Sequence, residues 1–266
     1  MEGKRVSLLR SQTRGIEAVA ADTTLVFGRH THEQFGVGLI LRGAQKSASG
    51  RGVVEAGAGD IVTVNPAEVH DGVPIGDAGR AWRMLYLAPA IVAELAADIG
   101  LPPSCEFTAP TFSDRRMVPL FGRLFRAVTA PDAGLAGLAT EQALLLMLGA
   151  LLQPRRGGLP AVPAGIASAR AMLDDDPLAA PTLAQLAGEA GLSRFQFLRG
   201  FARATGLTPH AYLVQRRLHR ARQLIGSGVR LADAAAASGF ADQSHMTRLF
   251  VRSFGMAPGS YAKALD

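Results

Sequence analysis

The sequence contains a single cysteine, Cys105, so the chain can form neither an intrachain disulfide nor a thiolate metal cage. It also contains no uncharged apolar run near ~20 residues, the length that a membrane-spanning helix needs. The most apolar stretch, residues 144–152, is too short. The first residues lack the long apolar core of a secretory signal. These absences favour a cytoplasmic protein with no membrane partner.

Charged residues are also scarce. They make up 19% of the 266 residues, whereas hydrophobic residues make up 48%, which is the balance of a folded protein. The formal net charge is +6. Between Thr182 and Lys263, eleven Arg or Lys residues stand against three acidic ones, a net of +8, so the rest of the chain sums to −2. A basic segment of this kind is attracted to a polyanion such as nucleic acid, although a solvated basic surface explains the charge equally well.

The spacing of hydrophobic residues divides the chain into a β part and a helical part. Up to about residue 90, short apolar runs alternate with glycine-rich breaks, which predicts a small barrel or sandwich. Residues 90–99, 114–128 and 135–152 have helical periodicity. The apolar surface of 135–152 is wide enough either to cover the barrel or to pack on a second subunit.

A Pro- and Gly-rich segment then interrupts both periods, and helical periodicity continues after it until the last few residues of the chain. We therefore expect an α+β protein of two domains. The first, over residues 1–152, is a β-barrel with a following helical layer. A linker covers residues 153–166, and an all-α domain covers residues 167–266.

The all-α region contains one unit twice. The sequence LAQLAGEAG at 183–191 matches LADAAAASG at 231–239 at an offset of 48, and after one inserted residue the offset becomes 49. Chance agreement over so many structurally decisive residues is improbable. At the second offset the identical pairs are Arg199 and Arg248, Phe201 and Phe250, Gly206 and Gly255, Pro209 and Pro258, and Tyr212 and Tyr261.

Each copy has the pattern of a helix-turn-helix unit. In the first copy an apolar stripe at i, i+3, i+4 and i+7 begins at Leu183, and Gly191 suits a left-handed helix end. Ser193 and Asp242 can cap the second helices of the two copies. A helix over 210–226, about 25 Å long at ~1.5 Å per residue, would hold the two units near the ~34 Å that separates successive major-groove segments.

The second helix of each unit should bury one face and expose the other. Apolar residues spaced i, i+4 (Phe197 and Phe201, then Met246 and Phe250) define the buried faces. Arg can bond two acceptors of guanine in the major groove, and Gln can bond two edge groups of adenine. The four arginines of the connecting helix, Arg216, Arg217, Arg220 and Arg222, are expected to be mainly solvated, with DNA contact as the alternative.

The segment GFADQSHMTRLFVRSFGMAP at 239–258 resembles the signature of the AraC/XylS family, and residues 183–212 resemble that family's first unit. This resemblance covers roughly the last hundred residues. It implies a sequence-specific transcription regulator that binds double-stranded DNA, and RNA polymerase if it is an activator. Leu198 stands where relatives are often polar, which favours contact with thymine methyl groups. The family's DNA-facing positions fall on Arg194, Phe195, Gln196, Leu198, Arg199, Gln243, Ser244, His245, Thr247 and Arg248.

Two histidine-containing tracts in the first domain, HTHE at 30–33 and GDIVTVNPAEVH at 59–70, resemble the two boxes of cupin barrels and the sensor domain of AraC-type regulators. The resemblance implies a small-molecule effector inside the barrel, with His32 and His70 as ligand contacts. Trp82 and Tyr86 lie an even number of residues apart on an expected strand over 81–87, so they can share its inner face.

Three neutral imidazoles, those of His30, His32 and His70, can in principle hold zinc or iron(II). The first cupin box normally adds a glutamate a few residues after its second histidine, but Gly36 and Val37 occupy that place here. We therefore expect no metal and no cofactor, and histidines that orient a ligand or are satisfied within the barrel wall.

The sequence thus favours a homodimeric regulator, not an enzyme, controlled by a small molecule in its N-terminal barrel. Two alternatives remain open. One is a metal-dependent cupin enzyme with an accessory DNA-binding tail, and the other is a regulator that senses nothing and uses the barrel only to dimerise.

Overall fold

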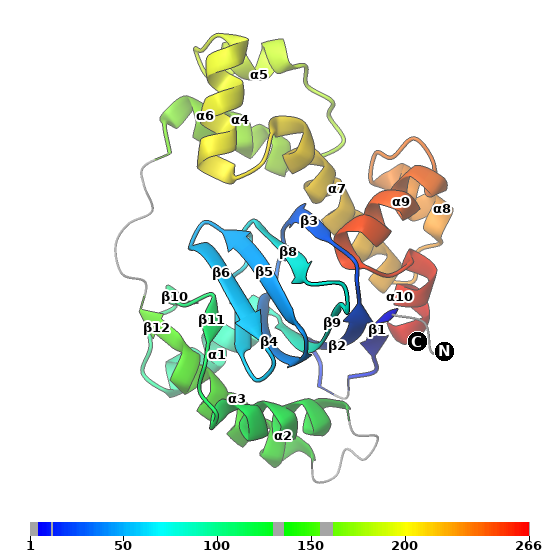
Figure 1. Cartoon of the computed structure of the whole chain (residues 1–266). Coiled ribbons are helices and arrows are strands. Elements are labelled where there is room, and N and C mark those ends of the chain that lie inside the picture. Colours follow the sequence, from blue (N-terminus) through cyan, green and yellow to red (C-terminus); the bar gives the residue numbers. More distant parts are fainter. Residues whose placement is uncertain (1–4, 12, 130–135, 155–161, 266) are drawn as a thin grey trace. The chain divides into compact units, whose positions relative to one another are not determined.

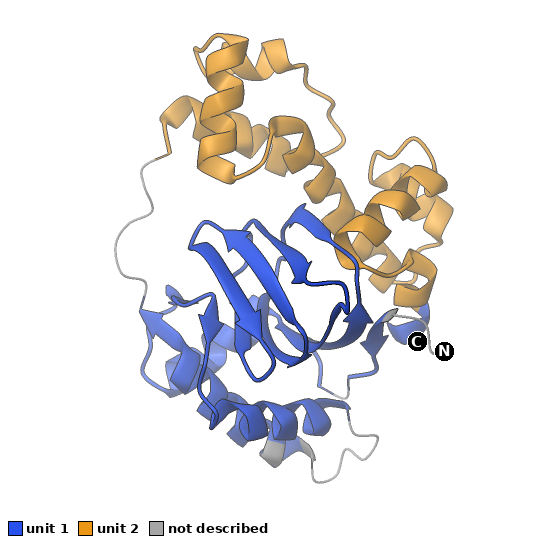
Figure 2. Cartoon of the chain, viewed as in Figure 1, with its two compact units in different colours: residues 1–156, 263–266 blue, residues 157–262 orange. Residues whose placement is uncertain are grey.

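The computed structural model describes residues 5–11, 13–129, 136–154 and 162–265. The chain divides into two compact units, one of residues 1–156 with 263–266 and one of residues 157–262 (Figure 2). The domain limits expected from the sequence stay predictions. Half of the expected linker, residues 155–161, lies outside the described residues.

The first unit is built on antiparallel sheets (Figure 1). The larger sheet has the strand order β1-β2-β9-β4-β7-β11 and the smaller one β3-β8-β5-β6, while β10 pairs with β12. The strands are β1 Arg5–Leu9, β2 Ile16–Thr23, β3 Phe27–His30, β4 Phe35–Arg42, β5 Ala44–Ser49, β6 Gly52–Gly57, β7 Ile61–Val64, β8 His70–Ile75, β9 Arg80–Leu87, β10 Cys105–Phe107, β11 Thr111–Phe112 and β12 Leu152–Pro154.

Side chains along β9 point alternately to the two faces of the larger sheet. Leu85 and Leu87 point to one face and belong to the main apolar core, whereas Met84 and Tyr86 point to the opposite, inner face. The guanidinium group of Arg80, on the inner face, donates to Gln45 Oε1 on β5 at 2.8 Å. Side chains from the two sheets therefore meet in one interior, which confirms the predicted β-rich domain.

Three helices cover the outer face of the larger sheet: α1 (Pro89–Asp98), α2 (Met117–Thr129) and α3 (Ala136–Leu151). They lie within a few residues of the three segments that the sequence predicts to be helical. Phe121 of α2 and Leu148 of α3 are completely buried against the sheet. Burial of side chains of this size stabilises the fold by about 1.5–3 kcal/mol each.

The second unit is helical, as predicted (Figure 1). The pairs α5–α6 and α8–α9 are the two helix-turn-helix units, and α7 joins them. The helices are α4 Ala164–Asp175, α5 Leu183–Glu189, α6 Arg194–Thr205, α7 Pro209–Gly226, α8 Leu231–Ala237, α9 Gln243–Phe254 and α10 Pro258–Leu265. Within the described part of the chain, no helix is long and apolar enough to span a bilayer.

Candidate nucleic-acid interface and ligand site

The second helices of the two units begin at the predicted caps. Ser193 Oγ accepts a hydrogen bond from the main-chain N–H of Gln196 at 3.3 Å, and Asp242 Oδ1 accepts one from the main-chain N–H of His245 at 2.6 Å. Both helices end at a glycine with a left-handed backbone, at φ 78° for Gly206 and 74° for Gly255. The repeat thus sets the start and the end of α6 and of α9.

Each of these helices buries one face completely. On α6 the buried residues are Phe197 and Phe201, and on α9 they are Met246 and Phe250, all with no exposed side-chain surface. The i, i+4 spacing predicted this face correctly. Phe201 also contacts the ring of Tyr212 edge-on at 5.5 Å, which holds α6 against α7.

The opposite faces carry the residues that the sequence predicts to read DNA. Large apolar side chains are exposed there, with Phe195 at 67% and Leu198 at 37%. The guanidinium group of Arg199 lies 5.6 Å from the centroid of the Phe195 ring, which orients it over the helix surface. The exposed members are Arg194, Phe195, Gln196, Leu198, Arg199, Gln243, Ser244 and Arg248, and the partly exposed ones are His245 and Thr247.

Gln196 and its repeat partner His245 have an additional structural role. The side-chain oxygen of Gln196 accepts a hydrogen bond from the N–H of Ser193 at 3.1 Å, which completes a capping box. The ring of His245 packs edge-on against Phe240 at 5.7 Å. The NH₂ group of Gln196 can donate to DNA without disturbing the cap. Its side-chain oxygen already accepts the Ser193 bond, so Gln196 cannot use both amide groups to bind one base while the cap is intact.

The arginines of α7 bind partners within the unit. Arg220 Nε donates to Ala237 O at 2.8 Å, and Arg216 Nε lies 3.1 Å from an Asp174 carboxylate oxygen. The guanidinium group of Arg222 lies over the Phe254 ring at 5.4 Å. Arg217 donates to the main-chain carbonyl of Gly239, in the turn of the second helix-turn-helix unit, and to that of Pro177, in the loop before α5. These arginines hold the two units in place, a role that the sequence did not reveal.

In the first unit of the fold, three histidines converge. The ring centroids of His30 and His70 are 4.4 Å apart, those of His30 and His32 are 5.0 Å apart, and those of His32 and His70 are 5.2 Å apart. His30 and His32 are buried, at 6% and 5% exposure. Ligand-capable nitrogens of all three lie within 4.8 Å of one another.

Of the two predicted ligand contacts on β9, Tyr86 lies next to the histidines and Trp82 does not. Tyr86 Oη lies 3.4 Å from His32 Nε2, so Tyr86 borders the histidines. Trp82 is four residues earlier on the same face of β9, about 13 Å away along the strand at ~3.3 Å per residue. Trp82 therefore lies farther along the strand and does not border the three histidines. His30, which was not among the predicted effector contacts, lies as close to His32 and His70 as these two lie to each other.

Main-chain hydrogen bonds determine the protonation of two of the rings. Nδ1 of His30 lies 2.8 Å from Gly28 O, and Nδ1 of His70 lies 3.1 Å from Glu68 O. A carbonyl oxygen only accepts, so Nδ1 carries the proton and Nε2 keeps the lone pair. Burial lowers the pKa of His70 to about 4, and the nearby charge of Arg51 adds to this effect while the Glu68 bond opposes it.

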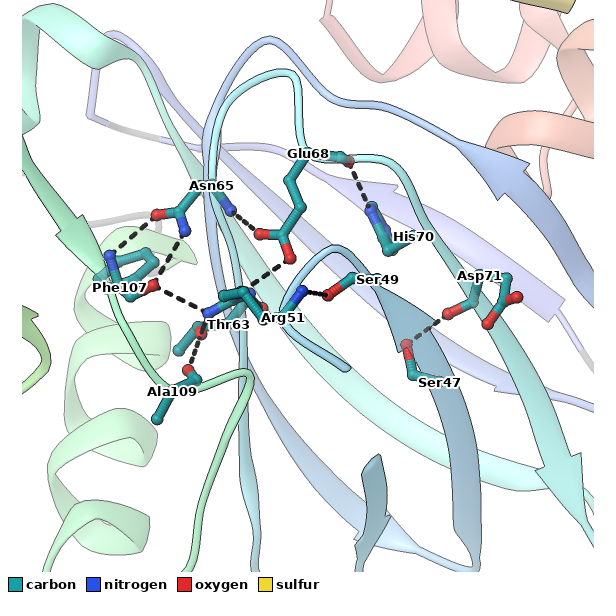
Figure 3. A network of polar contacts seen from close by, with 10 residues as sticks. All are labelled: Ser47, Ser49, Arg51, Thr63, Asn65, Glu68, His70, Asp71, Phe107 and Ala109. Atoms are coloured by element: carbon teal, nitrogen blue, oxygen red, sulfur yellow. Dashed lines mark hydrogen bonds and ion pairs between the residues drawn. The ribbon is translucent and has the colours of Figure 1, made fainter. Parts of the chain in front are cut away.

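A buried polar network holds the turn that carries His70 (Figure 3). Arg51 Nε donates to Glu68 Oε1 at 2.7 Å, and its other nitrogens donate to Thr63 O at 2.6 Å and to Phe107 O at 2.9 Å. Asn65 N–H donates to Glu68 Oε2 at 3.0 Å, so Glu68 accepts from both sides. The network joins β7, the following turn and β10, and thereby fixes the position of His70.

Comparison with known proteins supports the same division of the chain. Residues 15–148 match the AraC-like ligand binding domain, and residues 186–264 match a helix-turn-helix domain. The first match alone covers half of the chain. The chain belongs to the AraC family of transcription regulators. This regulator thus combines a ligand-binding domain with a DNA-binding helix-turn-helix domain, as its sequence predicts.

Similar proteins include an uncharacterized HTH-type transcriptional regulator, YbfI of Bacillus subtilis, which is 25% identical over 226 residues, 83% of this chain and 81% of YbfI. The transcriptional activator NphR of a Rhodococcus species is 40% identical over 83 residues, which are 31% of this chain and 24% of NphR. The structure of unsaturated fatty acid-bound ToxT from Vibrio cholerae has a TM-score of 0.57, with 12% identity, and covers 98% of this chain and 97% of ToxT. The last likeness is one of fold.

Proposed function

We propose that this regulator reads two successive major-groove segments of one DNA duplex, with α6 in the first segment and α9 in the second. The observation that carries the proposal is the matching construction of the two helices. Each buries one apolar face, begins at a side-chain cap and exposes an arginine, Arg199 or Arg248, at the same position of the repeat. Helices of helix-turn-helix proteins use such an outward face to contact base edges.

The chemistry of the exposed side chains suggests a role for each. Arg199 and Arg248 can each bind the two acceptors of a guanine, and Gln243 can bind an adenine. Phe195 and Leu198 offer apolar surface to thymine methyl groups, which fits their exposure. We assign the positions around them, Arg194, Gln196, Ser244, His245 and Thr247, to flanking base or phosphate contacts.

Selection of binding sites from random duplexes with the full chain tests this proposal. Arg199→Ala and Arg248→Ala should each weaken binding to the selected site by ~1–3 kcal/mol and relax preference at one base, in different halves of the site. The matched controls are Arg203→Ala and Arg252→Ala, which remove the same charge from the last turns of α6 and α9. Equal weakening on selected and random DNA would assign Arg199 and Arg248 to phosphates instead.

For the N-terminal domain, we propose that a small-molecule effector binds in the interior beside His32, His70 and Tyr86, with Trp82 reached only by a longer ligand. The contacts among the first three residues support a common site. Differential thermal denaturation against a panel of metabolites tests it, because an effector at ~100 times its dissociation constant stabilises the protein by about 2.7 kcal/mol. Unsaturated fatty acids belong in the panel, since ToxT binds one. No stabilisation by any compound would favour a barrel that only dimerises.

The remaining assignments are proposals as well. We infer a homodimer, because two leucines of α3, Leu138 and Leu146, are 78% and 55% exposed. Sedimentation of the wild type and of Leu138→Glu tests this. We also propose a cytoplasmic location, RNA polymerase as a partner in activation, and no enzymatic role; the transcription regulators among its relatives support these proposals. The alternative, a metal-dependent enzyme, has no support among those relatives.

A further inference from the structure

The geometry points to a metal site that the sequence argued against: we propose that His30, His32 and His70 together bind one divalent ion of the zinc type. The ion would lie in the interior of the N-terminal domain, bound by three neutral imidazoles. The proposal concerns this domain alone and does not depend on how α6 and α9 read DNA.

Distances among the three residues suit a shared ion. Their ligand-capable nitrogens lie within 4.8 Å of one another. Three such atoms bound to one zinc at ~2.0–2.1 Å would be about 3.3 Å apart, so each nitrogen needs to move inward by at most about 0.9 Å.

The hydrogen bonds around the rings are those that metal-binding histidines use. Such a histidine typically donates its second ring N–H to a carbonyl or carboxylate, which fixes the ring and the tautomer. His30 and His70 both do so, toward the main-chain oxygens of Gly28 and Glu68. Nε2 is then the nitrogen with the lone pair on each ring. Glu68 is itself held by Arg51, so the His70 ring has a rigid support.

The sequence argument against a metal was the missing carboxylate at Gly36. In the structure, a Cβ atom on Gly36 would lie 3.3 Å from Cε1 of Tyr86, so the tyrosine ring occupies the space into which a longer side chain would extend. Three histidines with an open fourth position form a complete zinc ligand set without any carboxylate. The absence of glutamate therefore changes the coordination that is expected but does not remove the site.

The donor set defines the class of ion. Imidazole nitrogen suits zinc, copper, nickel and iron, whereas magnesium and calcium require oxygen ligands. Three neutral ligands leave the full charge of the ion uncompensated. The fourth position would accordingly favour an anionic oxygen, from hydroxide or from a carboxylate-bearing effector.

Titration of untagged full-length protein with Co²⁺, after removal of metals by chelation, tests the proposal without DNA or effector. We expect one Co²⁺ per chain, the visible absorption of a four-coordinate ion, and its displacement by Zn²⁺. His30→Ala, His32→Ala and His70→Ala should each weaken binding at least ~100-fold. The matched control is His210→Ala, since His210 is exposed on α7.

Because His30 and His32 are buried, their variants can fail to fold, so X-ray absorption at the zinc edge of the wild-type complex provides a second measurement. Three imidazole ligands at ~2.0–2.1 Å would support the proposal. Absence of stoichiometric binding, a zinc spectrum without imidazole ligands, or full binding by the partly exposed His70→Ala variant would each overturn it. The histidines would then be a packed cluster of the barrel wall.

Discussion

Arg217, in the middle of α7, donates a hydrogen bond from Nη1 to the main-chain oxygen of Gly239 at 2.8 Å. Its Nε donates to the main-chain oxygen of Pro177 at 2.7 Å, in the loop between α4 and α5. One guanidinium group therefore joins the turn of the second helix-turn-helix unit to the loop that precedes the first unit. Arg217 therefore has hydrogen-bond partners within the chain and does not need DNA as a partner.

Gly239→Ala should destabilise the helical unit more than Gly191→Ala, although the two glycines are repeat equivalents. Both have positive φ, 78° and 65°, where alanine costs about 1–2 kcal/mol. A Cβ atom on Gly239 would also lie 3.0 Å from Arg217 Nε, whereas on Gly191 it would meet nothing within 4 Å. We expect Gly239→Ala to cost a further ~1–3 kcal/mol through the displaced hydrogen bonds. Urea unfolding followed by helical circular dichroism measures both.

A double-mutant cycle identifies the cause of this difference. With Arg217→Ala as the background, the extra cost of Gly239→Ala should disappear, because the side chain that it displaces is gone. If the difference in unfolding free energy between the two glycine variants is as large in that background as in the wild type, it does not come from Arg217.

Removing the Tyr212 hydroxyl should make stability less sensitive to alkaline pH. Tyr212 Oη donates to Asp174 Oδ1 at 2.7 Å, and burial, followed by this bond and the Asp174 charge, raises the pKa of Tyr212 above its ordinary value. Above about pH 10 the unfolded chain releases a proton that the folded chain retains, so this contribution to stability is lost as the pH rises toward the folded pKa. Tyr212→Phe should lose about 1–2 kcal/mol near neutral pH and show a shallower decline above pH ~10.

Unfolding free energies at about pH 8 and about pH 11, together with tyrosinate absorbance, check the change. The wild-type and Tyr212→Phe absorbance titrations should differ by one late-titrating group. A difference curve with an ordinary midpoint near pH 10 would mean that Tyr212 is neither buried nor bonded to Asp174 in solution.

Arg51→Ala should strongly destabilise the N-terminal unit. Arg51 and Glu68 are only 17% and 10% exposed, and loss of the cation leaves a buried carboxylate without its partner. Such a loss costs about 3–5 kcal/mol. Fluorescence of Trp82, the single tryptophan, reports unfolding of this unit selectively. The control is Arg42→Ala, which breaks an exposed pair with Asp22 and should cost less than ~1 kcal/mol. Equal effects of the two substitutions would refute a stabilising role for the network.

What could be predicted from the sequence depends on how local the signal is. The caps Ser193 and Asp242, the buried Phe197 and the left-handed Gly191 act within one or two helical turns, so spacing alone predicted them. The duplication doubled this local signal. For the same reason the limits of the long helix α7 lie within one residue of the expectation.

Contacts between distant segments were not predictable in this way. The Arg51 network joins residues 12, 17 and 56 positions apart, and no periodic pattern encodes such pairs. The proximity of His32 and His70 was expected only through the resemblance to cupin boxes. That His30 joins them depends on the pairing of β3 with β8, which brings His30 opposite His70. The partners of the α7 arginines depend on helix packing and were equally hidden.

Changing the spacing of the two half-sites in the selected DNA should prevent one chain from binding both half-sites at once. The 18 residues of α7 span about 27 Å, and this helix packs against α4, α6, α8 and α9. An insertion of about 5 base pairs turns the second half-site to the opposite face of the duplex, and about 10 base pairs restores the face but adds ~34 Å. Because α7 packs against helices of both units, neither DNA should bind better than a duplex in which one half-site is scrambled. Fluorescence anisotropy at one fixed salt concentration measures this, since phosphate contacts make every affinity depend on salt. Recovery of affinity with the longer insertion alone would show that α6 and α9 move independently, and α7 would then be a tether, not a rigid spacer.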